Sequence, residues 1–294
     1  MAIDDGDLVW FGRQGREDIR ARIGPLRGFE PFIAGVTERV VVQVGHRVDI
    51  FDPRNPDAPA VQGGPYVNVP VVVVMDGYWA GDPQPSNGSW IWRRYDWTGR
   101  PTATDPVEVS DPASRTNAPV PPPLLPIGET DGALVVFSRE RNALLRIDQR
   151  SVSDIGPGRP VAAGPAGVAL MRGDSLWYYP AASGPGVLLT DGLPWPTLAQ
   201  TDGAGQLSPD GDMVAVLFAD EHADAGSTLV VSGLDGDTSA TELELPSPRA
   251  TRVDWIDAGH VLVSGSSQPL IVNTQTMAVE QGPAVPAGVE LHVI

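Results

Sequence analysis

The clearest pattern in the chain is a short apolar strand that runs into a polar turn, repeated along the whole sequence. Each copy is a short stretch rich in apolar, β-branched or aromatic residues that ends in Asp, Asn, Gly or Pro, which is typical of a strand ending in a turn. The copies are Leu8–Gly12, Val48–Pro53, Trp92–Asp96, Leu144–Asp148, Leu176–Pro180, Leu229–Gly233 and Leu270–Asn273. Their turns lie about 43 residues apart on average, which is the length of a unit of four short strands.

A second apolar strand precedes most of these turns. These partner strands are 40–44, 71–75, 134–137, 168–171, 213–218 and 261–263. A small sheet with two apolar faces needs a neighbour on each side, and radial stacking of such sheets provides both neighbours. We therefore predict an all-β, seven-bladed β-propeller that occupies residues 1–294 as a single domain. A six-bladed propeller is the alternative, because the fourth interval between turns is short.

A ring of sheets must also be closed. The last residues, 289–294, form an apolar segment at the end of the chain. We expect this segment to form a strand in the same sheet as residues 7–12, so that the C-terminal strand seals the N-terminal blade.

The composition fits this architecture. The 294 residues include 33 glycines and 30 prolines, and that many turn residues favour short strands over long helices. No window holds the about 18 consecutive apolar residues that a membrane span needs, so we predict no membrane span. The acidic start, with Asp4, Asp5 and Asp7, differs from the basic start of a signal peptide, although a signal or anchor removed before Met1 remains compatible with the sequence.

Residue types that are absent from the sequence exclude several chemistries. The chain has no cysteine, which excludes disulfides, thiolate nucleophiles and iron–sulfur clusters. All 20 basic residues are arginine, so a lysine Schiff base and a phosphate-binding P-loop lysine are excluded as well. The formal net charge of −17 argues against a nucleic-acid partner, because that binding depends on concentrated positive charge.

The segment Leu207-Ser208-Pro209-Asp210-Gly211, followed by the strand 213–216, is a strand-entry turn. It resembles the L-S-P-D-G signature of TolB-type and WD40-like propeller repeats. Residues 131–136 and 257–263 are weakened copies of it. The resemblance implies a propeller that is exported or attached to the cell envelope and that binds other proteins, or a propeller attached to a hydrolase. The arginine-only usage resembles that of high-GC bacterial proteins.

Aromatic residues gather in one predicted blade. Tryptophan and arginine are common at protein interfaces, and tryptophan also stacks on sugar rings. A long loop, 81–89, separates the two halves of the cluster. The alternative is that some of these rings fill the core between blades, because strand alternation places Trp90 and Trp92 on one face and Tyr95 on the other. The candidate binding residues are Tyr78, Trp79, Trp90, Trp92, Arg93, Arg94 and Trp97.

One acidic loop is the candidate metal site. Asp220, Glu221 and Asp224 carry oxygen ligands of the kind that Ca²⁺ prefers, with His222 among them. A solvated acidic loop tip is the alternative interpretation. We predict no other cofactor, because the four histidines fall in different predicted blades.

The sequence lacks the local motifs of common hydrolases. No serine is flanked as in G-x-S-x-G, and H-E-x-x-H is absent. Our leading hypothesis is a non-enzymatic scaffold of the bacterial cell envelope that binds a protein or a cell-wall polymer through loops at one end of the ring. The alternatives are a propeller glycosidase or lyase with acidic residues at its central tunnel, or an accessory domain of a larger hydrolase.

Overall fold

The chain folds into β-strands. The computed structural model describes residues 2–4, 7–11, 17–22, 31–36, 39–55, 57–63, 71–84, 89–103, 106–110, 124–139, 141–148, 151–181, 183–193, 205–219, 226–237, 239–245, 250–265, 268–283 and 293. All regular secondary structure in these residues is β-strand, and none of them belongs to a helix that could span a membrane.

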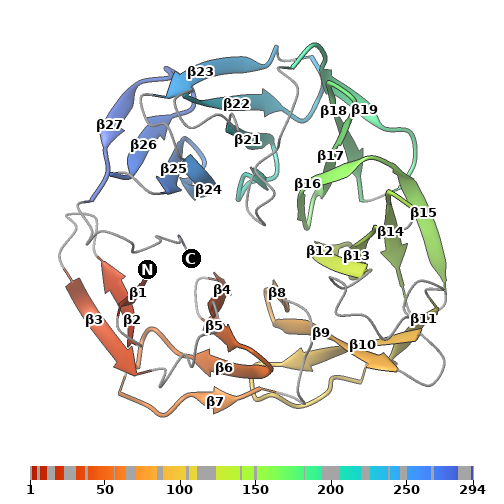
Figure 1. The fold of residues 1–294 in the computed structure, drawn as a ribbon, viewed down its shortest axis with the longest axis vertical. Coiled ribbons are helices and arrows are strands. Elements are labelled where there is room, and N and C mark those ends of the chain that lie inside the picture. Colours follow the sequence, from red (N-terminus) through yellow and green to blue (C-terminus); the bar gives the residue numbers. More distant parts are fainter. Residues whose placement is uncertain are drawn as a thin grey trace. The chain divides into compact units, whose positions relative to one another are not determined.

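The described strands form six four-stranded antiparallel sheets and one three-stranded sheet (Figure 1). The three-stranded sheet contains β1 (Ala2–Asp4), β2 (Asp7–Phe11) and β3 (Glu17–Arg22). The first two four-stranded sheets contain β4 (Pro31–Val36), β5 (Arg39–Val44), β6 (Arg47–Phe51) and β7 (Val61–Gln62), then β8 (Val72–Val74), β9 (Gly77–Gln84), β10 (Ser89–Asp96) and β11 (Val107–Ser110). The third and fourth contain β12 (Leu124–Thr130), β13 (Ala133–Ser138), β14 (Ala143–Ile147) and β15 (Val152–Pro157), then β16 (Arg159–Gly164), β17 (Gly167–Arg172), β18 (Ser175–Pro180) and β19 (Val187–Thr190). The last two contain β20 (Gly205–Leu207), β21 (Met213–Ala219), β22 (Ser227–Gly233) and β23 (Thr241–Leu245), then β24 (Ala250–Asp257), β25 (His260–Gly265), β26 (Leu270–Asn273) and β27 (Val279–Gln281).

The prediction of seven blades is wrong, because the described residues form six four-stranded sheets. The repeat count treated Leu8–Gly12 as a complete unit. Strand β2 instead lies between β1 and β3 in a sheet of three described strands. The fourth interval, although short, contains the four strands β15 to β18, so its length was not a guide to the number of blades. The predicted closing strand, 289–294, lies outside the described residues except for Val293.

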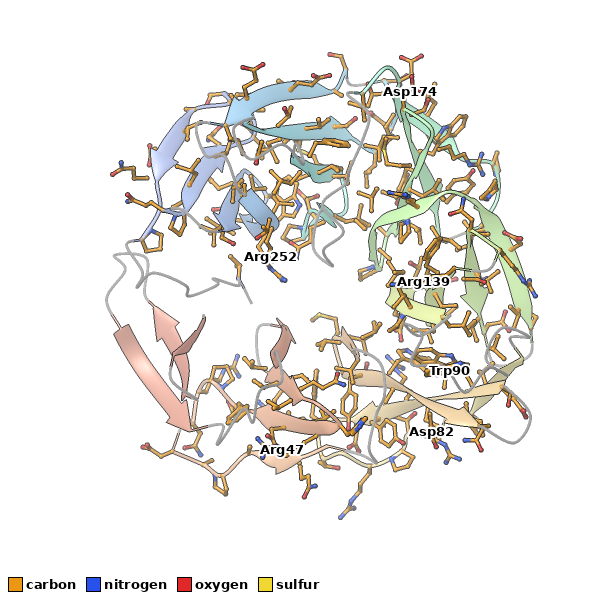
Figure 2. The ribbon with its side chains drawn as sticks, viewed as in Figure 1. Arg47, Asp82, Trp90, Arg139, Asp174 and Arg252 are labelled. Atoms are coloured by element: carbon orange, nitrogen blue, oxygen red, sulfur yellow. The ribbon has the colours of Figure 1, made fainter. Side chains whose placement is uncertain are left out.

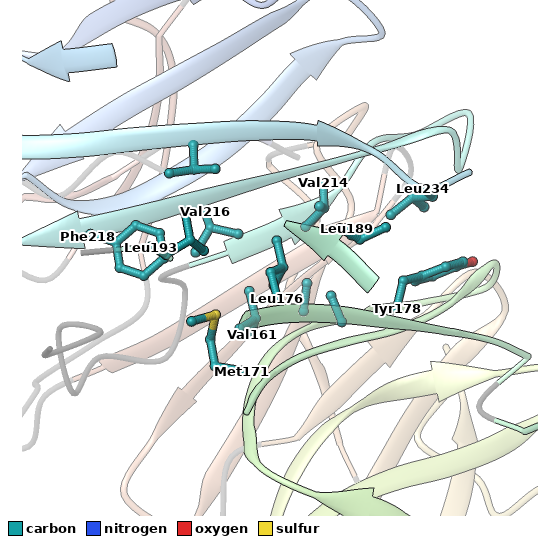
Figure 3. Close-up of a cluster of buried hydrophobic side chains, with 13 residues drawn as sticks. Val161, Met171, Leu176, Tyr178, Leu189, Leu193, Val214, Val216, Phe218 and Leu234 are labelled. Carbon is teal, nitrogen blue, oxygen red and sulfur yellow. The ribbon is translucent and has the colours of Figure 1, made fainter. Parts of the chain in front are cut away.

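The chain divides into two compact units, one of residues 1–20 and 158–293 and the other of residues 21–157 and 294. In the first unit, sheet β20–β23 packs on both neighbours. The cluster in Figure 3 joins it to sheet β16–β19 through side chains such as Leu176, Val214 and Phe218. A second cluster, which includes Leu229 and Val253, joins its other face to sheet β24–β27.

The second unit repeats this arrangement. One face of sheet β8–β11 packs on sheet β4–β7 through a cluster that includes Ile50 and Tyr95. The opposite face packs on sheet β12–β15 through a cluster that includes Trp92 and Leu134. Both faces of this sheet are therefore buried, which explains why its middle strands are apolar on both sides.

The turn before β21 has the hydrogen bonds that its sequence predicts. The Ser208 hydroxyl donates to the Asp210 carboxylate over 2.5 Å and accepts from the backbone N–H of Met213 over 2.9 Å. The hydroxyl bond is the main reason that the pKa of Asp210 lies below its ordinary value. Gly211 follows with a φ of 77°, which a residue with a Cβ rarely adopts.

Candidate functional site

The candidate site lies at one end of sheet β8–β11. Neighbouring strands are antiparallel, so the turn between the first two strands lies at the same end as the turn after the third strand. In this sheet the two turns begin at Met75 and at Trp97. The first turn of the adjacent sheet, Asp131-Gly132, lies near this end, because the Arg94 side chain contacts both Asp76 and the neighbouring strand's Glu129.

Four of the predicted binding residues lie in the core of the second unit. Trp79, Trp90 and Trp92 are buried in the cluster between sheets β8–β11 and β12–β15. Figure 2 labels Trp90. Trp90 and Trp92 stack with ring centroids 6.0 Å apart. Tyr78 is buried on the opposite face, where its ring stacks on Tyr95 over 5.3 Å. Strand alternation explains this division, and the four rings stabilise sheet packing in the structure.

The other three predicted residues reach the surface to different degrees. Arg93 is exposed, Arg94 is mostly buried, and Trp97 packs one part of its ring on the cluster that contains Tyr95. The indole Nε1 of Trp97 donates to the backbone oxygen of Met75 over 3.3 Å. Met75 itself is 72% exposed, the largest exposure among the large apolar side chains that the structure describes.

Asp96 holds the turn that carries Trp97. Its carboxylate accepts hydrogen bonds from the backbone N–H and the hydroxyl of Thr98, over 2.8 and 2.6 Å, and from the backbone N–H of Arg100 over 3.1 Å. The Thr98 hydroxyl is the main reason that the pKa of Asp96 lies below its ordinary value. Trp97 is thus held in one position by its own turn and by the Met75 carbonyl.

A charged network links this end of the sheet to its neighbour. The Arg94 guanidinium donates to Asp76 over 2.5 Å and to Glu129 over 3.2 Å. Glu129 also accepts a hydrogen bond from the buried indole N–H of Trp79. Glu129 therefore fixes both an arginine and a tryptophan of the next sheet, and sequence reasoning identified neither Glu129 nor Met75 as a site residue.

A second polar network joins β20 and β24, the first strands of two adjacent sheets in the first unit. Arg252 binds the buried carboxylate of Asp254 through two nitrogens, over 2.7 and 2.9 Å (Figure 2). The Gln206 side chain donates to Asp254 and accepts from the backbone N–H of Trp255, each over 3.0 Å. These hydrogen bonds pair polar groups of β20 and β24 with one another, so we interpret the network as one that holds the two sheets together.

The predicted metal ligands Asp220, Glu221 and Asp224 lie outside the described residues. Among the residues that the structure describes, no group of three or more histidine or acidic side chains is placed to hold a metal ion. The loop expected over 81–89 is partly strand, because β9 continues to Gln84.

Comparisons with known proteins show the fold. AztD from Citrobacter koseri is 13% identical, with a TM-score of 0.51 over 88% of this chain and 73% of its own. Hsv2p from Kluyveromyces lactis is 11% identical, with a TM-score of 0.55 over 84% and 74% of the two chains. A putative 6-phosphogluconolactonase from Bacteroides uniformis is 12% identical, with a TM-score of 0.54 over 83% and 80%.

No protein-family model and no curated protein sequence matches the chain. The structural neighbours are β-propeller proteins whose names indicate different roles. At this level of identity the likeness extends to the fold and not to the function. The chain has the β-propeller fold.

Proposed function

We propose that this protein is a non-enzymatic binding scaffold and that a protein partner docks on the Met75 surface, which we define as Met75, Asp76 and Trp97. The observation that supports this proposal most directly is the exposure of Met75 beside a tryptophan whose position is fixed. Exposed apolar side chains that cluster at one place often mark interaction sites.

The residue types on this surface suit a protein partner. Methionine and tryptophan are enriched at protein interfaces, and methionine adapts its shape to different partners. Trp97 is held by its turn, so little conformational entropy is lost when a partner covers it. The Met75 surface therefore combines a rigid anchor with an adaptable one.

The proposed location is the bacterial cell envelope. This part of the proposal rests on the resemblance of residues 207–216 to the TolB-type and WD40-like repeat, whose members are commonly exported. The names of the structural neighbours do not choose between a binding protein and an enzyme, because they include a putative 6-phosphogluconolactonase.

Site-specific photo-crosslinking tests the proposal. A photoreactive phenylalanine analogue is placed at position 75 or, as a control, at Val279, which is also exposed at 37% but lies on β27 in the other unit. Both proteins are irradiated in a bacterial cell-envelope extract, with and without the further substitution Trp97→Ala. We expect a discrete crosslinked species from position 75 that weakens at least fivefold with Trp97→Ala and is missing from position 279. Identical crosslinking patterns from the two positions would overturn the proposal.

A further inference from the structure

Two exposed carboxylates lie in the first turns of sheets β8–β11 and β12–β15. Asp76 follows Met75 in the same turn, and its side chain is 70% exposed. Asp131 lies in the first turn of the adjacent sheet, and its side chain is 74% exposed. Asp131 has a φ of 49°, a left-handed conformation that aspartate adopts in tight turns more readily than most residues.

The neighbouring arginines leave much of the bonding capacity of these carboxylates unused. A single guanidinium, that of Arg94, is shared between Asp76 and the more buried Glu129. The Asp131 carboxylate lies 3.6 Å from the Arg146 guanidinium, which is beyond the usual length of a hydrogen bond. An ionised carboxylate can accept about four hydrogen bonds, so Asp76 and Asp131 retain acceptors that face solvent.

The ion pairs that the structure describes here contain more acidic than basic side chains. Three carboxylates, those of Asp76, Glu129 and Asp131, face two guanidinium groups, those of Arg94 and Arg146. The whole chain has a formal net charge of −17, which adds to the local field at low ionic strength. An acidic segment would be repelled from this surface, and a basic one attracted.

We propose, building on the function proposed above, that the partner presents a polypeptide segment in which an apolar residue lies next to a lysine or an arginine. The apolar residue contacts Met75 and Trp97. The basic residue reaches the carboxylates of Asp76 and Asp131, where it replaces part of their hydration with charge-assisted hydrogen bonds. The apolar contact provides most of the affinity, while the carboxylates select among apolar segments by charge.

Selection from a library of displayed random nonapeptides tests the proposal without knowledge of the natural partner. The full chain is panned as wild type, as Asp76→Asn with Asp131→Asn, and as Met75→Ser, which removes the apolar side chain without adding charge. The matched control is Asp174→Asn with Asp191→Asn, which removes the same charge from two exposed positions of the first unit (Figure 2 labels Asp174). Far-ultraviolet circular dichroism and the thermal midpoint of each variant confirm that it is folded before panning.

We expect the wild type and the control variant to enrich peptides with lysine or arginine within three positions of an apolar residue. The Asp76→Asn, Asp131→Asn variant should bind individual selected peptides about threefold to tenfold more weakly at 0.05 M salt, with the difference mostly lost at 0.5 M salt. Peptides that depend on Met75 but show no basic enrichment would overturn this inference and leave the proposed function standing. Enriched peptides that bind Met75→Ser as well as the wild type would overturn both.

Discussion

The Gln206 side chain provides a direct test of how two sheets of the first unit are held together. Its amide nitrogen donates to the buried carboxylate of Asp254, and its amide oxygen accepts from the backbone N–H of Trp255. These atoms belong to β20 and β24, the first strands of adjacent sheets. Gln206→Leu removes both hydrogen bonds while keeping nearly the same side-chain volume.

The expected loss of stability depends on the two groups that lose a partner, the Asp254 carboxylate and the backbone N–H of Trp255. A hydrogen bond to a charged group is worth about 1.5–3 kcal/mol, and a buried backbone N–H without a partner costs about 1–3 kcal/mol. Gln206 is partly exposed, so water can reach part of the site and the lower half of each range applies. We expect Gln206→Leu to lower the free energy of unfolding by about 3 kcal/mol.

Equilibrium unfolding in urea, followed by far-ultraviolet circular dichroism and by tryptophan fluorescence, measures this loss. Gln206→Asn keeps the amide but shortens its reach, so it should destabilise the protein by a similar amount. The control Gln281→Leu makes the same glutamine-to-leucine change at an exposed position of β27. It should change the free energy of unfolding by less than about 0.5 kcal/mol. A loss below about 1 kcal/mol in Gln206→Leu would refute the reasoning, because apolar packing alone would then hold the sheets together.

Three further predictions concern the second unit. Gly81→Ala should destabilise the protein strongly, because the Cβ of the new alanine would lie 2.8 Å from the buried ring of Trp92. The thermal midpoint should fall far more in this variant than in Gly164→Ala, where the new Cβ would make only ordinary contacts. The pKa of Asp96 is lower in the folded protein than its ordinary value of 3.8, so the ionised carboxylate stabilises the fold above that pH. This stabilisation is lost as the pH falls through the lower, folded pKa. Resistance to urea should therefore fall less over that acid range in Asp96→Asn than in the wild type. Met75 should be the described methionine that hydrogen peroxide oxidises fastest, since the others are buried or partly buried, and peptide mass spectrometry reads this order directly.

Most middle strands of the sheets could be predicted from the sequence, and of the outer strands only β8 was predicted, as 71–75. Strands such as β13 and β21 are buried nearly throughout, so they appear as continuous apolar runs. Strand β27 is exposed at all three positions, and β7 has only two residues. An exposed edge strand carries no alternation of apolar and polar residues, so the sequence contains no pattern that would reveal it.

Strand β9 shows how pairing can override residue preference. Gly81 and Pro83 are rare in strands, which is why a loop was expected there. In the structure, β8 pairs with β9 only up to Trp79, so the rest of β9 has a single partner strand, β10. A proline can occupy such an edge without removing a ladder hydrogen bond that a central strand would need.

The candidate site was only partly visible in the sequence. Trp97 and Arg94 were selected because they belong to an aromatic and basic cluster, whereas Met75 was assigned to the end of a strand. The dipeptide Asp76-Gly77 is a turn signal that could have placed Met75 in an exposed turn. Glu129 could not have been found this way, because only the packing of β12 beside β8 brings it to Arg94.

The fold itself explains why aromatic content was a poor guide to the binding surface. Both faces of sheet β8–β11 are covered by neighbouring sheets, so a large ring in the middle of a strand is buried whatever its chemistry. The ends of the strands are not covered in this way, and there the turn residues decide what is exposed. Trp97 differs from Trp90 and Trp92 in this respect alone, because it follows the last residue of β10. In a protein built from stacked sheets, the position of an aromatic residue relative to the strand end is therefore more informative about binding than the number of aromatic residues nearby.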